Sequence, residues 1–439
     1  MRISIVGTGY VGLSTGVGFA KMGNNVVCMD IDKGKVDAVN AGRPPIYEPG
    51  MESLLKNAID KGSLRATTDL DDAVMNSEIT FISVPTPQRN DGSSDMGYIE
   101  KASDAIGHAL KAKKAYHVVV VKSTVVPGTT EGVVLPALEK ASGKKAGKDF
   151  GLCMNPEFLR EGRALGDFLK PDRIVIGSLD ARAGNAVEGL YSGFDSPVLR
   201  TDLKTAEMIK YASNALLATK ISFSNEIGNI CKGLGIDAYE VMGGVGMDSR
   251  ISPHFLQAGA GFGGSCFPKD VAAVAAKGRE LGKETKILDS VLETNRAQRK
   301  CVVDLIEQKV GGLSGKNVAV LGLAFKPNSD DIRESPSIDI ISMLKGCGAE
   351  VSAYDPQAME NMKAIHPDIE YCKTPGDCLR GADLCLILTD WDEFKDLSEK
   401  DFDVMNSRVI IEGRKVLNPK SVKCFEGLCW PGNADKQKN

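Results

Sequence analysis

The sequence lacks any apolar run approaching the ~20 residues that are needed to cross a membrane. Its opening, MRISIVGTG, passes directly into a strand pattern and a glycine turn, so we expect no secretory signal peptide. A dominant charge is also missing, because the formal net charge is −4 and the basic residues are dispersed. We therefore expect neither a membrane nor a nucleic acid as the main partner.

Metal-binding patterns are scarce as well. The chain has four histidines, all far apart in sequence, and no CxxC pair, so we predict no metal site. Its eleven cysteines are odd in number and scattered singly. This predicts reduced thiols and a cytoplasmic location rather than a disulfide framework. With 439 residues, at roughly 150 residues per domain, two or three domains are expected.

A nucleotide-binding pattern opens the chain. Residues 2–6 predict a buried strand, GTGYVG follows at 7–12, and an apolar helix to about Met22 leads to a second strand that ends at Asp30. A glycine turn between strand and helix, with an acid about 20 residues further on, is typical of dinucleotide binding. The turn glycines are Gly7, Gly9 and Gly12.

This pattern favours NAD. The pyrophosphate would rest on the helix N-terminus, and Asp30 would hold the adenosine ribose and repel the extra phosphate of NADP. Lys35, one turn into the next helix, either helps to hold the adenosine or is an ordinary surface lysine.

Further strand ends carry polar residues. Strands at 78–84 and 117–123 end near Thr86 and Thr124, which either line the nicotinamide side of a site or belong to turns beside proline. After a short strand, FGLCMNPEFLREG brings Glu157, Arg160 and Glu161 together. Two carboxylates on a strand-end loop suit proton handling, although a solvated loop would have the same composition.

One long helix is predicted from about Asp202 to Gly233. About 30 residues at 1.5 Å each give ~45 Å, a length that usually spans between domains and often packs against its twin in a dimer. Lys210 and Asn214 lie four residues apart and share one face of this helix. They either form an oxyanion hole or belong to a polar stripe that faces water.

The segment GAGFGGSCFPKD, residues 259–270, contains the strongest candidate nucleophile. Pro268 at the first helical position makes Phe267 the expected cap and places Cys266 just outside the positive end of a helix. There, with Lys269 nearby, the pKa of the thiol should be lowered. The glycines would let a ligand approach the backbone closely, and Asp270 lies one turn beyond. The alternative is a tight loop with a buried structural cysteine.

The C-terminal part repeats the nucleotide-fold layout without its phosphate-turn glycines. After a linker at 311–316, a strand at 317–322 and a helix lead to a strand that ends at Asp355, and strands at 383–389 and 407–412 extend the sheet. We expect this domain to bind something other than a dinucleotide. Lys326 and Arg333 in its first loop suit phosphates.

The predicted fold is therefore α/β, with two Rossmann-like doubly wound domains joined by a long central helix and a helical dimerisation region. We expect an NAD-binding domain at 1–200, a central helical domain at 201–305, a nucleotide-sugar domain at 306–430 and a disordered tail at 431–439.

Taken together, these motifs resemble the UDP-glucose/GDP-mannose dehydrogenase family, whose members oxidise the C6 alcohol of a nucleotide sugar to a carboxylate. The similarity runs from GTGYVG to EGRKVL, nearly the whole chain. The motifs that carry it are KSTVVPGT, NPEFLREG with DFLKPDRIVIG, EMIKYASN, GFGGSCFPKD, GLAFKPNSDDIRESPS and TDWDEF. One departure is EGR at 412–414, where many relatives have DGR.

The resemblance implies a role for each matching residue. Cys266 would be the nucleophile, and Asp270 would support proton transfer or the hydrolytic water. Lys210 and Asn214 would stabilise the oxyanion, and Thr124 and Glu157 would hold a water near the reacting carbon. The implied NAD contacts are Val11, Asp30, Lys35, Thr86, Thr124, Glu161, Lys269 and Arg333. The implied nucleotide-sugar contacts are Glu157, Phe158, Leu159, Arg160, Glu161, Lys210, Asn214, Phe255, Leu256, Gln257, Ala258, Gly259, Gly263, Lys326 and Arg414, with Arg250 lent across a dimer interface.

The implied reaction is a four-electron oxidation with two NAD, through a thiohemiacetal and a thioester on Cys266. Covalent capture would keep the aldehyde from escaping. NPEFLREG, PDRIVIG and TDWDEF favour UDP-glucose over GDP-mannose, and the residues after NPE disfavour UDP-N-acetylmannosamine. A silent nucleotide-sugar sensor would lack the cysteine or the lysine. A two-electron β-hydroxyacid dehydrogenase would need neither the thiol nor a second nucleotide domain.

Overall fold

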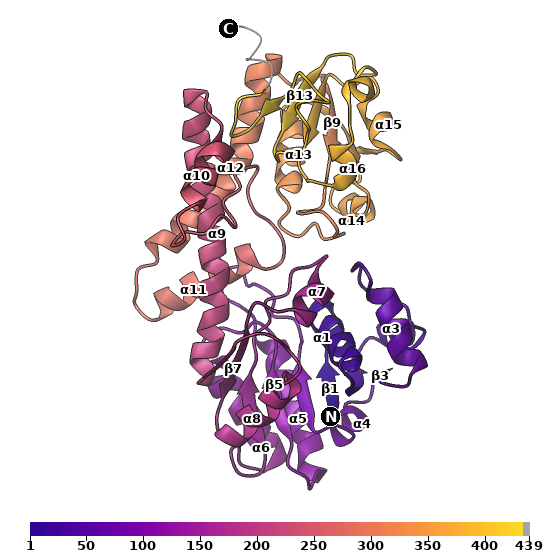
Figure 1. The fold of residues 1–439 in the computed structure, drawn as a ribbon, viewed down its shortest axis with the longest axis vertical. Helices are drawn as coiled ribbons and strands as arrows, with labels where there is room; N and C mark the ends of the chain where they lie inside the picture. The colour runs from indigo at the N-terminus through magenta and orange to yellow at the C-terminus, as the bar shows by residue number, and fades with distance from the viewer. Residues whose placement is uncertain (433–439) are drawn as a thin grey trace. The chain divides into compact units, whose positions relative to one another are not determined.

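The computed structural model describes residues 1–432 and divides the chain into two compact units, Met1–Ser213 and Asn214–Asn439. The long helix α9 (Leu203–Leu234) runs through the point of division. Each unit contains one mostly parallel sheet with helices on both faces, which confirms the predicted fold class (Figure 1).

The first unit contains an eight-stranded sheet in the order β3-β2-β1-β4-β5-β6-β7-β8. The first six strands have the order of a Rossmann sheet, and β7 departs from the parallel pattern by pairing antiparallel to β6. The strands are β1 (Arg2–Val6), β2 (Asn25–Met29), β3 (Leu64–Thr67), β4 (Ile79–Ile82), β5 (Val118–Val121), β6 (Gly151–Met154), β7 (Ile174–Ser178) and β8 (Val198–Thr201).

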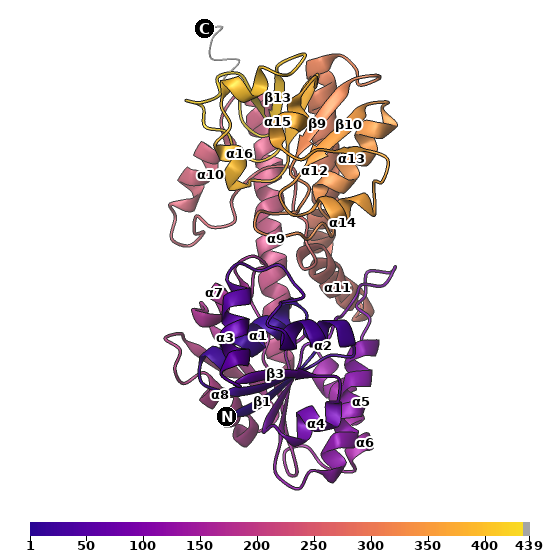
Figure 2. The ribbon, with the colours of Figure 1, turned by 90° about the vertical axis from the view of Figure 1, so that its right-hand side faces the viewer.

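Helices cover both faces of this sheet (Figure 2). Alternate side chains of each strand enter opposite cores: Val118 and Val120 of β5 enter one, and Val119 and Val121 the other. A strand that is buried on both faces needs such a continuous apolar run. The helices are α1 (Tyr10–Lys21), α2 (Lys33–Asn40), α3 (Met51–Asp60), α4 (Leu70–Met75), α5 (Gly97–Ala112), α6 (Leu135–Ser142), α7 (Ala164–Leu169) and α8 (Ala181–Leu190), with a π-helical turn at Thr130–Val134.

The second unit joins the central helices to the C-terminal sheet. Its central helices are the later turns of α9, then α10 (Ala238–Gly246), α11 (Phe267–Glu280) and α12 (Lys286–Val310). Side chains near the ends of α9 and α12 enter the same hydrophobic core as the sheet. The expected boundary at residue 305 therefore lies inside α12, because that helix contributes its last turns to the C-terminal core.

The C-terminal sheet is parallel, in the order β11-β10-β9-β12-β13-β14. Its strands are β9 (Asn317–Leu321), β10 (Glu350–Tyr354), β11 (Glu370–Tyr371), β12 (Leu384–Ile387), β13 (Val409–Glu412) and β14 (Glu426–Gly427). Its shorter helices are α13 (Pro336–Gly346), α14 (Met359–Lys363), α15 (Pro375–Leu379) and α16 (Asp392–Lys395), with a 3₁₀ turn at Glu399–Phe402. In the tail that was expected to be disordered, residues 433–439 lie outside the described part of the chain.

Within residues 1–432, no helix combines the length and apolar character that a membrane crossing requires. None of the eleven cysteines, all of which lie in that range, is in a disulfide.

Candidate active site

The turn between β1 and α1 explains two of its three glycines. Gly7 has φ +99° and packs against Ser83, whose carbonyl oxygen would lie 2.6 Å from a Cβ at this position. A Cβ at Gly12 would collide with the carbonyl oxygen of Gly7, so this glycine allows the helix to pack on the strand. At Gly9, by contrast, a Cβ would meet nothing within 4 Å. No side chain caps the N-terminus of α1, whose N–H groups are thus suited to a pyrophosphate.

Asp30, at the end of β2, is oriented by this turn. Its carboxylate accepts hydrogen bonds from the Thr8 N–H (2.8 Å) and hydroxyl (2.6 Å) and from the Asp32 N–H (3.0 Å). Although burial alone would raise it, these hydrogen bonds and the charge of Lys35 hold the pKa of Asp30 below its ordinary value. A carboxylate has about four acceptor sites, so one remains for a ribose hydroxyl. The glycine turn and this acid fit NAD.

Thr86 and Thr124, at the ends of the neighbouring strands β4 and β5, lie together. The Thr86 hydroxyl donates to the Thr124 carbonyl oxygen at 2.9 Å. The loop after Thr124 is fixed by Glu207 of α9, which accepts hydrogen bonds from the Gly128 N–H and from both the N–H and the hydroxyl of Thr130. The sequence showed no sign of this support, because Glu207 is one of two acids on a long helix and no local pattern marks it.

Glu157 and Lys210 form a buried ion pair in the first unit. Lys210 Nζ lies 2.8 Å from Glu157 Oε1, and both side chains are at most 5% exposed. The other carboxylate oxygen accepts from the Leu159 N–H at 2.6 Å. Burial alone would raise the pKa of Glu157, but Lys210, this hydrogen bond and the charge of Lys122 hold it below its ordinary value. The resemblance places both residues at the reacting carbon, and the structure brings them together.

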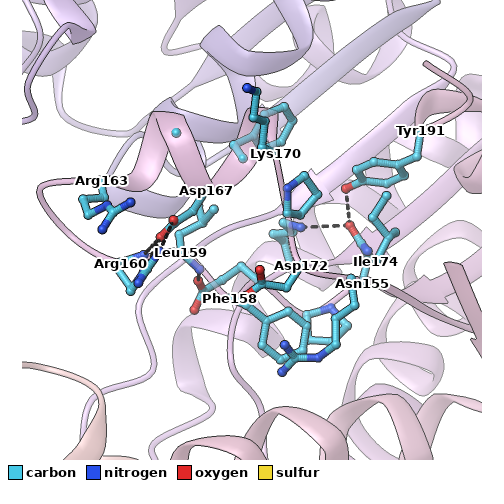
Figure 3. A pocket seen from close by; sticks show the side chains of 17 residues that line it. Asn155, Phe158, Leu159, Arg160, Arg163, Asp167, Lys170, Asp172, Ile174 and Tyr191 are labelled. Carbon is cyan, nitrogen blue, oxygen red and sulfur yellow. Dashed lines mark hydrogen bonds and ion pairs between the residues drawn. The ribbon is translucent and has the colours of Figure 1, made fainter. Parts of the chain in front are cut away.

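The loop around Glu157 borders a cavity of about 370 Å³ (Figure 3). Arg160 lies at one side of it, in a bidentate ion pair with Asp167 (2.9 and 2.6 Å). The Phe158 ring packs under the Arg173 guanidinium, 3.8 Å from the ring centroid, and Lys210 Nζ lies 5.6 Å from the same centroid. These contacts define the positions of Phe158 and Arg160. Leu159 and Glu161, next to them in the chain, are half-buried.

Asp270 is the centre of a second polar cluster, in the second unit. Its buried carboxylate accepts from Asn214 Nδ2 at 2.7 Å and from Lys269 Nζ at 2.7 Å. The sequence predicted that Asn214 shares a helix face with Lys210. The hydrogen bond between Asn214 and Asp270, 56 residues away, is known only from the structure.

Cys266 stands at the N-cap of α11, which begins at Phe267. The expectation that Phe267 would be the cap was wrong by one residue. Pro268 fits the second helical position as well as the first, because neither position needs its N–H for the helix. The Cys266 thiol is half-buried, with the Ser265 hydroxyl 3.5 Å from Sγ, and its carbonyl oxygen accepts from the Asp270 N–H at 2.8 Å.

The glycines before Cys266 are required by close packing within the protein. A Cβ at Gly259 would lie 2.5 Å from the Gly413 carbonyl oxygen, and one at Gly263 would lie 2.3 Å from that of Glu334. Gly261 (φ +102°) and Gly264 (φ +83°) combine a positive φ with similarly close neighbours. From the sequence, these glycines were predicted to let a ligand approach the backbone. The alternative explanation is that they make room for other loops of the second unit.

Three buried amide side chains hold this glycine loop, and none of the three was predicted from the sequence. Asn225 of α9 accepts from the Gly259 N–H at 2.8 Å, and Gln298 of α12 donates to the carbonyl oxygen of the same residue at 2.9 Å. Asn295 of α12 pairs with both peptide groups of Phe262. The only available signal was a pair of amides three residues apart in LETNRAQR, which looks like an exposed helix face.

The predicted cationic residues of the second unit lie in different settings. Arg414 donates to the carbonyl oxygen of Gly261, so it adjoins the glycine loop. Arg333 forms a bidentate ion pair with Asp331, and its carbonyl oxygen accepts from the Gly264 N–H. Arg250 is 87% exposed and pairs with Asp248. Lys326 lies over the ring of Phe325.

The segment before the glycine loop also carries predicted contacts. Phe255 has a positive φ of 62° and its ring packs against that of Phe267. Leu256 and Ala258 are buried, and Gln257 is exposed. The Ala258 carbonyl oxygen accepts from the Tyr239 hydroxyl at 2.8 Å.

Asp355 in the second sheet occupies the place that Asp30 has in the first. It accepts from the Leu323 N–H (2.7 Å), the Ala324 N–H (3.0 Å) and Trp391 Nε1 (3.0 Å), and it is fully buried. These donors come from the loops after β9 and β12, so the Asp355 carboxylate is taken up by hydrogen bonds within the second unit.

A glycine turn suited to a pyrophosphate, an acid suited to a ribose and polar residues at strand ends are typical of an NAD-dependent oxidoreductase of the α/β class. The domain matches make the assignment specific. Residues 1–195 match the NAD binding domain of the UDP-glucose/GDP-mannose dehydrogenase family, residues 204–297 its central domain, and residues 319–419 its UDP binding domain. The chain belongs to this family.

Individual relatives are similar over nearly their whole length. A UDP-glucose 6-dehydrogenase of Haloferax volcanii is 46% identical over 98% of this chain and 100% of its own. A GDP-mannose 6-dehydrogenase of Pseudomonas savastanoi pv. phaseolicola is 40% identical over 94% of this chain and 91% of its own. The solved structure of a UDP-glucose dehydrogenase from Pyrobaculum islandicum covers 98% of each chain, with 45% identity and a TM-score of 0.92.

Proposed function

We propose that this chain oxidises UDP-glucose at C6 to UDP-glucuronate, consuming two NAD+ and one water and releasing two NADH and three protons. The observation that carries this proposal is the 46% identity, across all three domains, to a protein named UDP-glucose 6-dehydrogenase. The presence of Cys266, Lys210 and Asn214 supports the four-electron chemistry, because a simple alcohol dehydrogenase needs no covalent capture.

The proposed mechanism uses Cys266 as the nucleophile. NAD, when bound, accepts a hydride from C6 in each of the two oxidation steps. Cys266 adds to the aldehyde to give a thiohemiacetal, whose oxidation leaves a thioester that water hydrolyses to the uronate. The helix N-terminus next to Cys266 favours a thiolate at this position.

The polar residues around the reacting carbon have proposed roles that follow their contacts. Lys210 and Asn214 stabilise the negative charge that develops twice on the same oxygen. Asp270, held by Asn214 and Lys269, supports proton transfer or the hydrolytic water. Glu157 and Thr124 hold a water, and Glu157 pairs with Lys210 when no oxyanion is present.

Binding roles are proposed for the remaining matched residues. NAD is held by the Gly7–Gly12 turn, Asp30 and Lys35, by Thr86 and Thr124, and by Glu161, Lys269 and Arg333. The nucleotide sugar is held by 157–161, 255–259, Gly263, Lys326 and Arg414. The exposed position of Arg250 suits a residue that a partner subunit supplies.

A homodimer through α9 is also proposed. In the part of α9 that belongs to the second unit, Leu216, Phe223 and Ile230 are 63%, 50% and 56% exposed. Their spacing of seven residues places them on one stripe of the helix. Large apolar side chains in an exposed stripe are typical of an interface between chains. Eleven cysteines without a disulfide are consistent with the cytoplasm as its location.

GDP-mannose is the alternative substrate, because relatives named GDP-mannose 6-dehydrogenase are 40% identical. The deciding experiment measures NADH formed per sugar nucleotide consumed, with UDP-glucose and GDP-mannose in parallel. Two NADH per UDP-glucose and little turnover of GDP-mannose are expected. One NADH per substrate would contradict the thioester mechanism, and preferential turnover of GDP-mannose would contradict the substrate.

A further inference from the structure

Lys122 is a buried lysine to which the mechanism above gives no role. It follows β5 directly, as the first residue of the motif KSTVVPGT, and is only 5% exposed. Its Nζ donates a hydrogen bond to Asn155 Oδ1 at 2.9 Å. Lysine is almost never fully buried without a partner, so this ammonium needs an explanation.

Asn155 connects Lys122 to the loop that carries Glu157. Its Oδ1 also accepts from the Tyr191 hydroxyl at 2.6 Å (Figure 3), and its Nδ2 donates to the Val175 carbonyl oxygen at 2.8 Å. The amide is therefore held on three sides, and only Pro156 separates it from Glu157 in the chain. Lys122, Asn155, Glu157 and Tyr191 line the same cavity.

Two buried lysines, Lys122 and Lys210, act on the single buried carboxylate of Glu157. The charged groups that shift the pKa of Glu157 are the two ammonium groups of Lys210 and Lys122, and Tyr191 bonds to Asn155. The other charged side chains that line this cavity are Arg160, Arg163, Asp167, Lys170, Asp172 and Arg173. Burial lowers the pKa of Lys122 to about 8, with the charge of Glu157 opposing and that of Lys210 adding to the effect. The buried carboxylate thus has two cations, of which only Lys210 contacts it at 2.8 Å.

We propose that Lys122 is a positioning residue for the oxidation: its ammonium anchors the Asn155–Glu157 turn and keeps Glu157 ionised when Lys210 turns from that carboxylate to the oxyanion. The inference rests on the proposed function, in which Lys210 serves the oxyanion. A single lysine cannot neutralise both anions at once, and a buried carboxylate without a nearby cation takes up a proton. Lys122 supplies the second charge.

The test compares Lys122→Met with Tyr191→Phe. Each variant removes one hydrogen bond to the same atom, Asn155 Oδ1, but only the first removes a charge. Because the remaining donor still satisfies Asn155, both variants are expected to fold. In Lys122→Met the acid limb of the pH profile of kcat for UDP-glucose, which reports groups in the substrate complex, should move up by about one pH unit. In Tyr191→Phe it should stay at its wild-type position.

Lys122→Arg, which keeps the charge, should retain the wild-type acid limb even if kcat falls. An unchanged acid limb in Lys122→Met, or equal shifts in Lys122→Met and Tyr191→Phe, would overturn the inference and leave the proposed function intact. A wild-type protein that does not oxidise UDP-glucose would instead refute the proposed function. The carboxyl band of Glu157, assigned in infrared difference spectra against Glu157→Gln, reports its ionisation without turnover. As the pH is lowered, this band of the protonated acid should appear at a higher pH in Lys122→Met than in the wild type.

Discussion

Asn295 binds both peptide groups of Phe262: its Oδ1 accepts from the N–H at 2.7 Å and its Nδ2 donates to the carbonyl oxygen at 2.9 Å. The Phe262 ring in turn packs edge-on against Phe267, with centroids 5.9 Å apart, and Phe267 directly follows Cys266. A side chain of α12 thereby determines the backbone four residues before the proposed nucleophile.

Asn295→Asp should disturb this loop while leaving the rest of the fold in place. The carboxylate can still accept from the Phe262 N–H, but it has no proton for the carbonyl oxygen and leaves that group unsatisfied. We expect kcat/KM for UDP-glucose to fall by at least about tenfold, because small displacements of a reacting group are costly. NAD affinity should be unchanged.

Ser222→Ala is the matched control for Asn295→Asp. Ser222 donates to the Val291 carbonyl oxygen at 3.0 Å and so also joins α9 to α12, but its hydroxyl makes no hydrogen bond to the glycine loop. It should lower the melting temperature without altering kcat/KM. Equal kinetic losses in the two variants would mean that general helix packing, rather than the loop, determines the rate.

Cys266→Ser should stop the reaction near the aldehyde or its adduct, because a serine hydroxyl is a much weaker nucleophile than a thiolate. Steady-state NADH production should fall by several orders of magnitude, with NAD binding, measured by fluorescence quenching, intact. If steady-state turnover of this variant equals that of the wild type, Cys266 has no part in the mechanism.

Glu412, where this chain departs from the DGR of many relatives, should make stability depend on pH. Burial raises the pKa of Glu412 to about 7, despite hydrogen bonds from the Leu417 and Val416 N–H groups. Because the folded pKa lies above the unfolded value of 4.5, the protonated side chain stabilises the fold, and this contribution is lost as the pH rises from about 4.5 to 7.

Glu412→Gln removes that titration and keeps an acceptor oxygen. Its melting temperature relative to the wild type should therefore rise between pH 4.5 and pH 8, by an amount that corresponds to at most about 3 kcal/mol. A constant difference between the two proteins across this range would show that Glu412 is ionised in both the folded and the unfolded state.

Phe223→Asp should weaken the proposed dimer. A charge in the middle of the exposed stripe of α9 opposes burial against a second copy. Sedimentation velocity at micromolar concentration should show a shift to monomer. The control is Leu199→Asp, on β8, because Leu199 is 49% exposed but lies outside the stripe. A wild-type protein that already sediments as a monomer would contradict the dimer itself.

Local sequence patterns were enough to predict the elements of the NAD-binding domain. The strand, the glycine turn and Asp30 are close together in the chain, and the requirements of a tight turn act within a few residues. The buried apolar run of β5 and the extent of α9 followed from the sequence for the same reason, because each element has its own repeating pattern.

Contacts between residues that are distant in the chain could not be predicted from local sequence patterns. Glu157 with Lys210, Asn214 with Asp270, and Asn295 with Phe262 each join segments that are 33 or more residues apart. Nothing in a helix sequence distinguishes a buried amide that binds a loop from an exposed one. Lys122 was likewise passed over within a motif that had been recognised.

The sequence by itself determined the two nucleotide-type sheets, the long helix and the residue types of the site, because turn geometry and hydrophobic periodicity are local. Only the tertiary structure decided which cation each buried carboxylate meets and why glycine is needed before Cys266. Those outcomes depend on which side chains approach one another once the cores have formed, and dense packing leaves room for only one arrangement.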